Sequence, residues 1–178
     1  PPGSPPGPDA VRVPAPGGPA LRGARLAAAP PAGVELHRTW HRTRPEEGAD
    51  PGAADVGEWH RVDLTDRDTT TALVLGLRPD VVVHTAYALA DGEHAIVAAS
   101  AHVADAAATA GAGLVHLSSD VVFDGEHAPY DEDHSLLPIS PYGRHKAEAE
   151  GRVAAACPGA ALARTTLLTW ADPLDPRS

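Results

Sequence analysis

The stretch "DVVVHTAY" (residues 80–87) is a continuous apolar run that turns polar at its end. Such a run is typical of a strand that is buried on both faces of a parallel sheet. A second run of this kind, "GLVHLSSDVVF" (113–123), becomes polar at Ser118. Between the two, residues 93–111 carry apolar residues and alanines at helical spacing and end at Gly111. The pattern therefore predicts a strand, a helix and a second, parallel strand.

The same alternation continues outward in both directions. The predicted elements are strands at 33–40, 59–66, 80–87, 113–123 and 160–170, and helices at 65–79, 93–111 and 140–156. Thr65 or Asp66 is the expected N-cap of the helix at 65–79. Ser140 is the expected N-cap of the helix at 140–156, and Pro141 suits its first position. Strict alternation with right-handed connections predicts an α/β fold with a doubly wound parallel sheet, incomplete at both ends. In such sheets ligands bind at the carboxyl ends of the strands.

Composition limits the class of partner. The 178 residues carry a formal net charge of -10, which argues against a surface for nucleic acid or an anionic membrane. The single cysteine, Cys157, excludes an internal disulfide and fits a reducing compartment. No apolar run is long enough to span a bilayer. We therefore expect a soluble, cytoplasmic protein.

Residues 1–32 differ from the rest, because they hold ten of the nineteen prolines. Composition alone predicts a disordered, low-complexity segment there. The α/β pattern begins at Val34. The chain also lacks methionine and begins Pro-Pro-Gly-Ser, from which we expect a partial or processed chain.

Three polar side chains form a candidate catalytic group. Tyr142 and Lys146 lie four residues apart on the last predicted helix and so share a face, and Ser119 ends the preceding strand. A neighbouring ammonium group favours the phenolate, so we expect a lowered pKa for Tyr142, which suits proton exchange with a carbonyl or alcohol. Lys146 is the only lysine beside thirteen arginines. Its compact ammonium suits this place better than a guanidinium, because it can also reach ribose hydroxyls.

Several segments around this group keep a fixed order: "LRPDVVVHTAY" (77–87), "SSDVVFDG" (118–125), "YDED" (130–133), Pro138, "PYGRHK" (141–146) and "ARTTLLTW" (163–170). Together they resemble the extended short-chain dehydrogenase/reductases, and within them the dTDP-4-dehydrorhamnose reductase group. The resemblance covers roughly residues 33–170. The paired segments in register are specific, whereas either one alone is not.

The resemblance implies a Rossmann-like fold and hydride transfer from NAD(P)H to a keto group on a nucleotide sugar. It implies a catalytic set of Ser119, Tyr142 and Lys146. It also implies cofactor contacts at Asp63, Leu64, Thr85, Ala86, Tyr87, Tyr142 and Lys146, and substrate contacts at Ser119 and Asp120. Arg42 lies where an acidic residue would hold a free ribose, so a 2′-phosphate is favoured and NADPH is the expected cofactor, with NADH as the alternative.

The family's glycine fingerprint is altered here. Gly17 and Gly23 keep the spacing of two of its phosphate-binding glycines, but Ala20 replaces the middle one. Pro14 and Pro16 fall where a central strand would lie, and proline argues against such a strand. We therefore expect residues 1–32 to be a degraded or frame-shifted first βα unit, which the other two frames of the coding DNA would reveal. We expect residues 33–178 to be an NAD(P)-binding domain that is truncated before the substrate lobe.

Plainer interpretations stand beside these. Ser118 and Ser119 can simply cap a turn, Asp63 can be a turn aspartate, and Arg42 can be a solvated charge. Apolar residues of helix 93–111 are interpreted as core, with a helix-pair homodimer surface as the alternative. No ligand spacing among the ten histidines indicates a metal, so no metal site is expected.

The alternatives for function come from different classes. One is a non-catalytic dinucleotide- or sugar-nucleotide-binding subunit that regulates a partner enzyme. Another is an NAD-dependent sugar epimerase or dehydratase, which would retain NAD and consume none. A third is a non-functional gene fragment.

Overall fold

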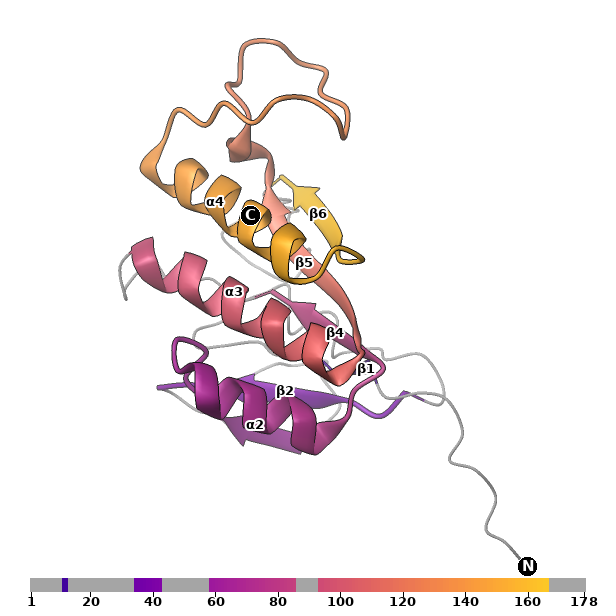
Figure 1. The fold of residues 1–178 in the computed structure, drawn as a ribbon. Coiled ribbons are helices and arrows are strands. Elements are labelled where there is room, and N and C mark those ends of the chain that lie inside the picture. The colour runs from indigo at the N-terminus through magenta and orange to yellow at the C-terminus, as the bar shows by residue number, and fades with distance from the viewer. Residues whose placement is uncertain (1–10, 13–33, 43–57, 86–92, 167–178) are drawn as a thin grey trace, which may run out of the picture.

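The computed structural model describes residues 11–12, 34–42, 58–85 and 93–166 (Figure 1). Its elements in chain order are β1 (Val11–Arg12), β2 (His37–Trp40), β3 (Glu58–Arg61), α2 (Arg67–Leu77), β4 (Val81–His84), α3 (Glu93–Ala110), β5 (Gly113–Ser119), the 3-10 helix η1 (Asp120–Val122), α4 (Pro141–Ala156) and β6 (Ala161–Thr165). Strands and helices alternate as the sequence predicts, and every element predicted from residue 33 onward is present, although most are shorter than their predicted ranges.

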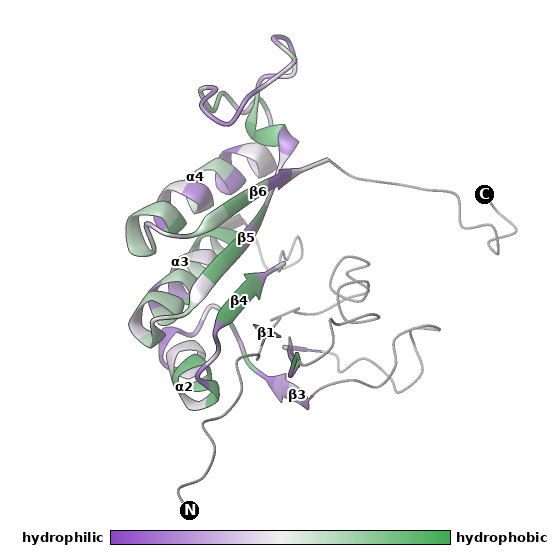
Figure 2. Ribbon diagram, turned by 90° about the vertical axis from the view of Figure 1, so that its right-hand side faces the viewer, coloured by the Kyte–Doolittle hydropathy of each residue, from purple (hydrophilic) through white to green (hydrophobic). Residues whose placement is uncertain are grey.

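The strands form a parallel sheet in the order β1-β4-β5-β6, and β2 and β3 form a second parallel pair. Because β1 also contacts β2, the strands follow the order 3-2-1-4-5-6 that is typical of dinucleotide-binding folds. Helices α2, α3 and α4 cover one face of the sheet (Figures 1 and 2). The structure confirms the predicted Rossmann-like α/β fold.

Local sequence signals define the helix ends. Asp66 caps α2, accepting hydrogen bonds from the backbone N–H groups of Asp68 and Thr69 at 3.0 Å each. Ser140 caps α4 in the same way, accepting from the N–H of Gly143 at 2.9 Å, and Pro141 occupies the first turn as predicted. Gly111, which follows α3, has a positive φ of 69° that glycine adopts without strain.

The core lies between the sheet and the three helices. Val82 of β4 and Leu114 of β5 face Val103 of α3 and Val153 of α4 in one buried cluster. Three small side chains of α3, those of Ala104, Ala106 and Ala107, are fully buried and let this helix pack closely against its neighbours. Val103 is therefore core within the chain, as the sequence interpretation favoured. Among the described residues, no helix is long and apolar enough to cross a membrane.

Candidate functional site

The carboxyl end of β5 leads directly into η1, and Ser119 makes this junction. Its Oγ accepts a hydrogen bond from the N–H of Val121 at 3.5 Å and donates one to Asp120 Oδ1 at 3.1 Å. Of the two serines considered for a turn-capping role, Ser119 is the one that caps η1. Ser118 points to the opposite side of the strand, where it is buried and its hydroxyl has no partner among the described residues.

Lys146 reaches this strand end from α4. Its side chain is only 3% exposed, and its Nζ donates a hydrogen bond to the carbonyl oxygen of Leu117 at 2.7 Å. Leu117 lies two residues before Ser119 on β5. Burying an ammonium removes its hydration and costs free energy, and the hydrogen bond to the Leu117 carbonyl offsets part of that cost. The structure thus brings the ammonium of Lys146 to the strand end that Ser119 forms.

Glycine at position 143 brings the start of α4 against η1. A Cβ atom there would lie 2.2 Å from the carbonyl oxygen of Val121, so only glycine allows this approach. Tyr142, the residue before it, is half-buried on the first turn of α4. The contact holds Tyr142 and Ser119 on neighbouring elements. Sequence reasoning did not single out Gly143, because its role depends on a carbonyl 22 residues away in the chain.

Two buried histidines lie beside the lysine, and sequence reasoning missed both. His84 of β4 and His116 of β5 pair in register, with ring centroids 5.2 Å apart. Burial, the neighbouring imidazole and the charge of Lys146 hold the pKa of His84 well below its usual range. Burial and then the charge of Lys146 lower the pKa of His116 to about 3. Both imidazole rings are therefore neutral, and the charged group beside them is the ammonium of Lys146.

The loop between η1 and α4 is tied down by polar contacts. Tyr130 donates a hydrogen bond to Asp124 Oδ1 at 2.5 Å, and its ring stacks on Phe123 with centroids 4.3 Å apart. Several hydrogen bonds lower the pKa of Asp124, and the one from Tyr130 has the largest effect. Arg164 lies over Phe123 and forms a two-pronged ion pair with the buried Glu150. The quoted "YDED" segment therefore has a structural role.

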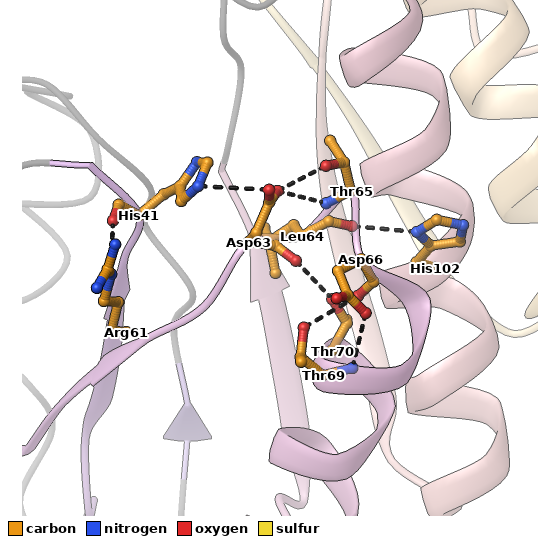
Figure 3. A network of polar contacts seen from close by, with 9 residues as sticks. All are labelled: His41, Arg61, Asp63, Leu64, Thr65, Asp66, Thr69, Thr70 and His102. Carbon is orange, nitrogen blue, oxygen red and sulfur yellow. Dashed lines mark hydrogen bonds and ion pairs between the residues drawn. The ribbon is translucent and has the colours of Figure 1, made fainter.

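A second polar group lies where β2 and β3 end (Figure 3). Asp63 accepts hydrogen bonds from the N–H and the hydroxyl of Thr65 at 2.9 and 2.6 Å, and lies 3.3 Å from His41 Nε2. The hydroxyl of Thr65 is the main cause of the lowered pKa of Asp63, and the charges of His41 and Arg42 add to it. The structure thus brings Asp63 and Arg42 together, while also giving Asp63 the contacts of a turn aspartate.

The remaining predicted cofactor residues fall in different places. Leu64 is buried in the core, and its carbonyl accepts a hydrogen bond from His102 Nδ1 at 3.2 Å (Figure 3). Thr85 follows β4 and is buried, at the carboxyl edge of the sheet. Gly17, Gly23, Ala86 and Tyr87 lie outside the described residues. The exposed Asp120, predicted to face substrate, starts η1 at the same edge.

Comparison with known proteins gives a family. The family model described as "RmlD substrate binding domain" matches residues 33–171. The dTDP-4-dehydrorhamnose reductase of Sinorhizobium fredii (strain NBRC 101917 / NGR234) is 39% identical over 114 residues, which cover 58% of this chain and 38% of that protein. The methionine adenosyltransferase 2 subunit beta of Danio rerio is 32% identical over 115 residues, covering 61% and 36%. The chain thus spans well under two thirds of the relatives it matches.

Solved structures give the same fold. A dTDP-4-dehydrorhamnose reductase from Clostridium acetobutylicum superposes with a TM-score of 0.66 at 25% identity, covering 90% of this chain and 55% of that one. The dTDP-4-dehydrorhamnose reductase of Bacillus anthracis, solved in complex with NADP, gives 0.68 at 23% identity, covering 90% and 56%. These likenesses agree with the strand order described above.

Proposed function

This chain belongs to the RmlD substrate binding domain family of extended short-chain dehydrogenase/reductases, and from that premise we propose that it binds NADPH and reduces a keto group on a nucleotide-activated sugar. NADPH, when bound, supplies the hydride. Ser119, Tyr142 and Lys146 supply the groups that orient and protonate the carbonyl oxygen. NADH is the alternative cofactor.

The observation that carries the proposal is the burial of Lys146 against β5. Its Nζ lies 2.7 Å from the Leu117 carbonyl, at the sheet edge where open α/β folds bind ligands. The paired His84 and His116 are neutral, and Lys146 is the cation that acts on both of them. A cation so placed favours the phenolate form of a neighbouring phenol.

Each catalytic residue has a separate task in this proposal. Tyr142 gives its proton to the carbonyl oxygen as that oxygen gains charge. Lys146 stabilises the phenolate that remains, and its ammonium is compact enough to hold ribose hydroxyls as well. Ser119 hydrogen-bonds the carbonyl oxygen and fixes its direction, which requires its hydroxyl to leave Asp120.

The group at the ends of β2 and β3 suits the adenosine end of the cofactor. Arg42 places positive charge beside Asp63, whose carboxylate accepts hydrogen bonds from Thr65 and lies 3.3 Å from His41 Nε2. A carboxylate accepts from ribose hydroxyls, whereas the guanidinium of Arg42 attracts a 2′-phosphate. These residues fit NADPH, and Arg42→Ala is the variant that would shift preference towards NADH.

The proposal is tested by following NADPH oxidation with a panel of nucleotide-activated 4-keto sugars. Tyr142→Phe should abolish turnover while NADPH still binds, because only the transferable proton is lost. Tyr130→Phe is the matched control: it also removes one phenolic hydroxyl, but from the loop contact with Asp124, and it should keep turnover. Unchanged turnover in Tyr142→Phe would refute the assignment.

A second candidate is a binding subunit that regulates a partner enzyme. It is favoured by the relatives named methionine adenosyltransferase 2 subunit beta, which include a Xenopus tropicalis protein 36% identical over 116 residues. A subunit of this kind would bind the dinucleotide, turn over none of the keto sugars, and co-elute with a methionine adenosyltransferase catalytic chain in size-exclusion chromatography. Turnover in the same assay would decide for the reductase.

A further inference from the structure

Strands β2 and β3 are unusually polar for neighbouring strands of a parallel fold, and β3 stands out as hydrophilic in Figure 2. Their register sets His37 opposite Glu58 and Thr39 opposite His60. Since side chains alternate along a strand, His37, Glu58 and His60 share one face of the pair. Their ligand atoms all lie within 4.8 Å of one another, and theirs is the one such group found in the described part of the chain.

Three specific atoms form a compact triangle. His37 Nδ1 lies 2.9 Å from His60 Nε2, and each of these nitrogens lies 3.9 Å from Glu58 Oε2. The point equidistant from the three atoms is about 2.1 Å from each, which matches the ~2.0–2.2 Å bonds that zinc makes to imidazole nitrogen and carboxylate oxygen. Glu58 is 71% exposed, so its carboxylate can adjust towards tetrahedral angles and water can fill a fourth position.

A fourth side chain orients the first histidine. His37 Nε2 lies 3.3 Å from Glu35 Oε1, so its N–H can donate to that carboxylate. The proton is then on Nε2, and the lone pair of Nδ1 faces His60 and Glu58. Histidines that bind metals commonly donate their other N–H to a carboxylate, which fixes the tautomer and raises the basicity of the ligand nitrogen.

We propose that His37, Glu58 and His60 bind one divalent first-row transition ion, of which Zn²⁺ is the representative. Two imidazoles and one carboxylate suit Zn²⁺, whereas Mg²⁺ and Ca²⁺ prefer ligand sets made of oxygen. The ion would cross-link β2 to β3. The site is separate from the proposed adenosine group, because His41 and Asp63 lie beyond the opposite ends of these two strands.

The sequence predicted no metal site, because the ligands have no recognisable spacing: His37 and the Glu58/His60 pair stand 21 and 23 residues apart. Without metal, the same atoms can share a single proton, as a hydrogen bond from His60 to His37 across 2.9 Å. The two states differ in one measurable respect. Only the metal site needs the carboxylate of Glu58.

The test is titration of Zn²⁺ into the metal-free full chain by isothermal titration calorimetry, with thermal unfolding measured alongside. The wild-type chain should bind one ion and its Tm should rise with Zn²⁺, because an ion that binds only the folded state stabilises it. Glu58→Gln and His60→Gln should each weaken binding by about tenfold or more and remove the Tm rise. Glu58→Gln changes an exposed side chain, so it leaves the fold intact.

Two controls locate the ion. His41→Gln removes the pair with Asp63 at the far end of the strands, and His127→Gln removes an exposed histidine of the η1–α4 loop. Both should bind Zn²⁺ as the wild type does. The proposal is overturned if the wild-type chain binds no Zn²⁺, if Glu58→Gln and His60→Gln bind it with unchanged affinity, or if only a control loses binding.

Discussion

At the scale of single residues, the molecule is organised around charges that have been taken out of water. Lys146 is held by one main-chain oxygen and two neutral imidazoles lie near it. Glu150, one turn further along the same helix, is equally buried but is matched by the guanidinium of Arg164. The glutamate is thus paired within the chain, which suits a structural role. In the proposed function, Lys146 combines its hydrogen bond to β5 with a binding role.

The buried histidines predict an acid-sensitive fold. The pKa of His116 falls from 6.5 in the unfolded chain to about 3 in the folded one. As the pH drops below about 6.5, His116 is protonated in the unfolded chain but stays neutral in the folded one. The free energy of unfolding should therefore fall by up to about 1.4 kcal/mol per pH unit. His84 acts in the same direction. Urea unfolding between about pH 7 and pH 5 measures the slope.

His116→Leu is the variant that isolates this effect. It removes a titrating ring that has no hydrogen-bond partner among the described residues, so little is lost at neutral pH. Its free energy of unfolding should depend less steeply on pH than that of the wild type. Identical slopes for the two proteins would show that His116 is already protonated in the fold or does not differ from its unfolded state.

The Glu150–Arg164 ion pair should contribute strongly to stability. Arg164 reaches Glu150 through Nε and Nη2, with the shortest contact at 2.9 Å, and also donates to the carbonyl of Glu132. Glu150→Gln leaves the guanidinium without its carboxylate and should lower the free energy of unfolding by about 3 kcal/mol. Glu148→Gln is the control: its ion pair with Arg152 is exposed and should matter by about 0.5 kcal/mol or less. Equal losses in urea unfolding would contradict this ranking.

At the scale of elements, the contact between α4 and η1 sets the geometry of the candidate site. It joins the helix that carries Tyr142 and Lys146 to the turn that begins at Ser119. The contact depends on Gly143, because a side chain at this position would collide with the carbonyl of Val121 and the ring of Pro138. A shift of this helix start would move the tyrosine without moving the serine.

Gly143→Ala should therefore disturb both stability and the site. The added Cβ would lie 2.2 Å from a backbone oxygen, so α4 or η1 must move, at a cost of about 1–3 kcal/mol. Gly151→Ala makes the same change in the same helix where nothing lies within 4 Å, and should stabilise by up to about 1 kcal/mol. Thermal unfolding of both variants checks the contrast. A Gly143→Ala variant as stable as Gly151→Ala would mean that α4 lies further from η1.

The elements show why part of this structure could be predicted from sequence. The caps at Asp66 and Ser140 act over two or three residues, so the sequence predicts them directly. The pairing of His84 with His116, and of His37 with the β3 residues, depends on strand register between distant segments. No local pattern encodes that register. For the same reason, the spacing of the histidines along the chain indicates no metal site.

At the scale of the whole molecule, the strand order brings the proposed functional residues to one edge. Ser119 ends β5, Thr85 and Asp63 follow β4 and β3, and Lys146 reaches the same side from α4. The alternating pattern predicted this edge, because parallel strands with right-handed connections align their carboxyl ends. The polar partners of each residue could not be predicted, since a hydroxyl such as that of Ser119 can cap a turn as readily as bind a ligand.

The most direct test of the account is a crystal structure of this chain with NADPH. We predict the nicotinamide ribose within hydrogen-bonding distance, about 2.6–3.2 Å, of Lys146 Nζ and Tyr142 Oη, with Ser119 Oγ turned towards the same space. A dinucleotide bound away from the carboxyl edge of β4 and β5, or a Lys146 that stays on Leu117 with the ribose out of its reach, would contradict the account.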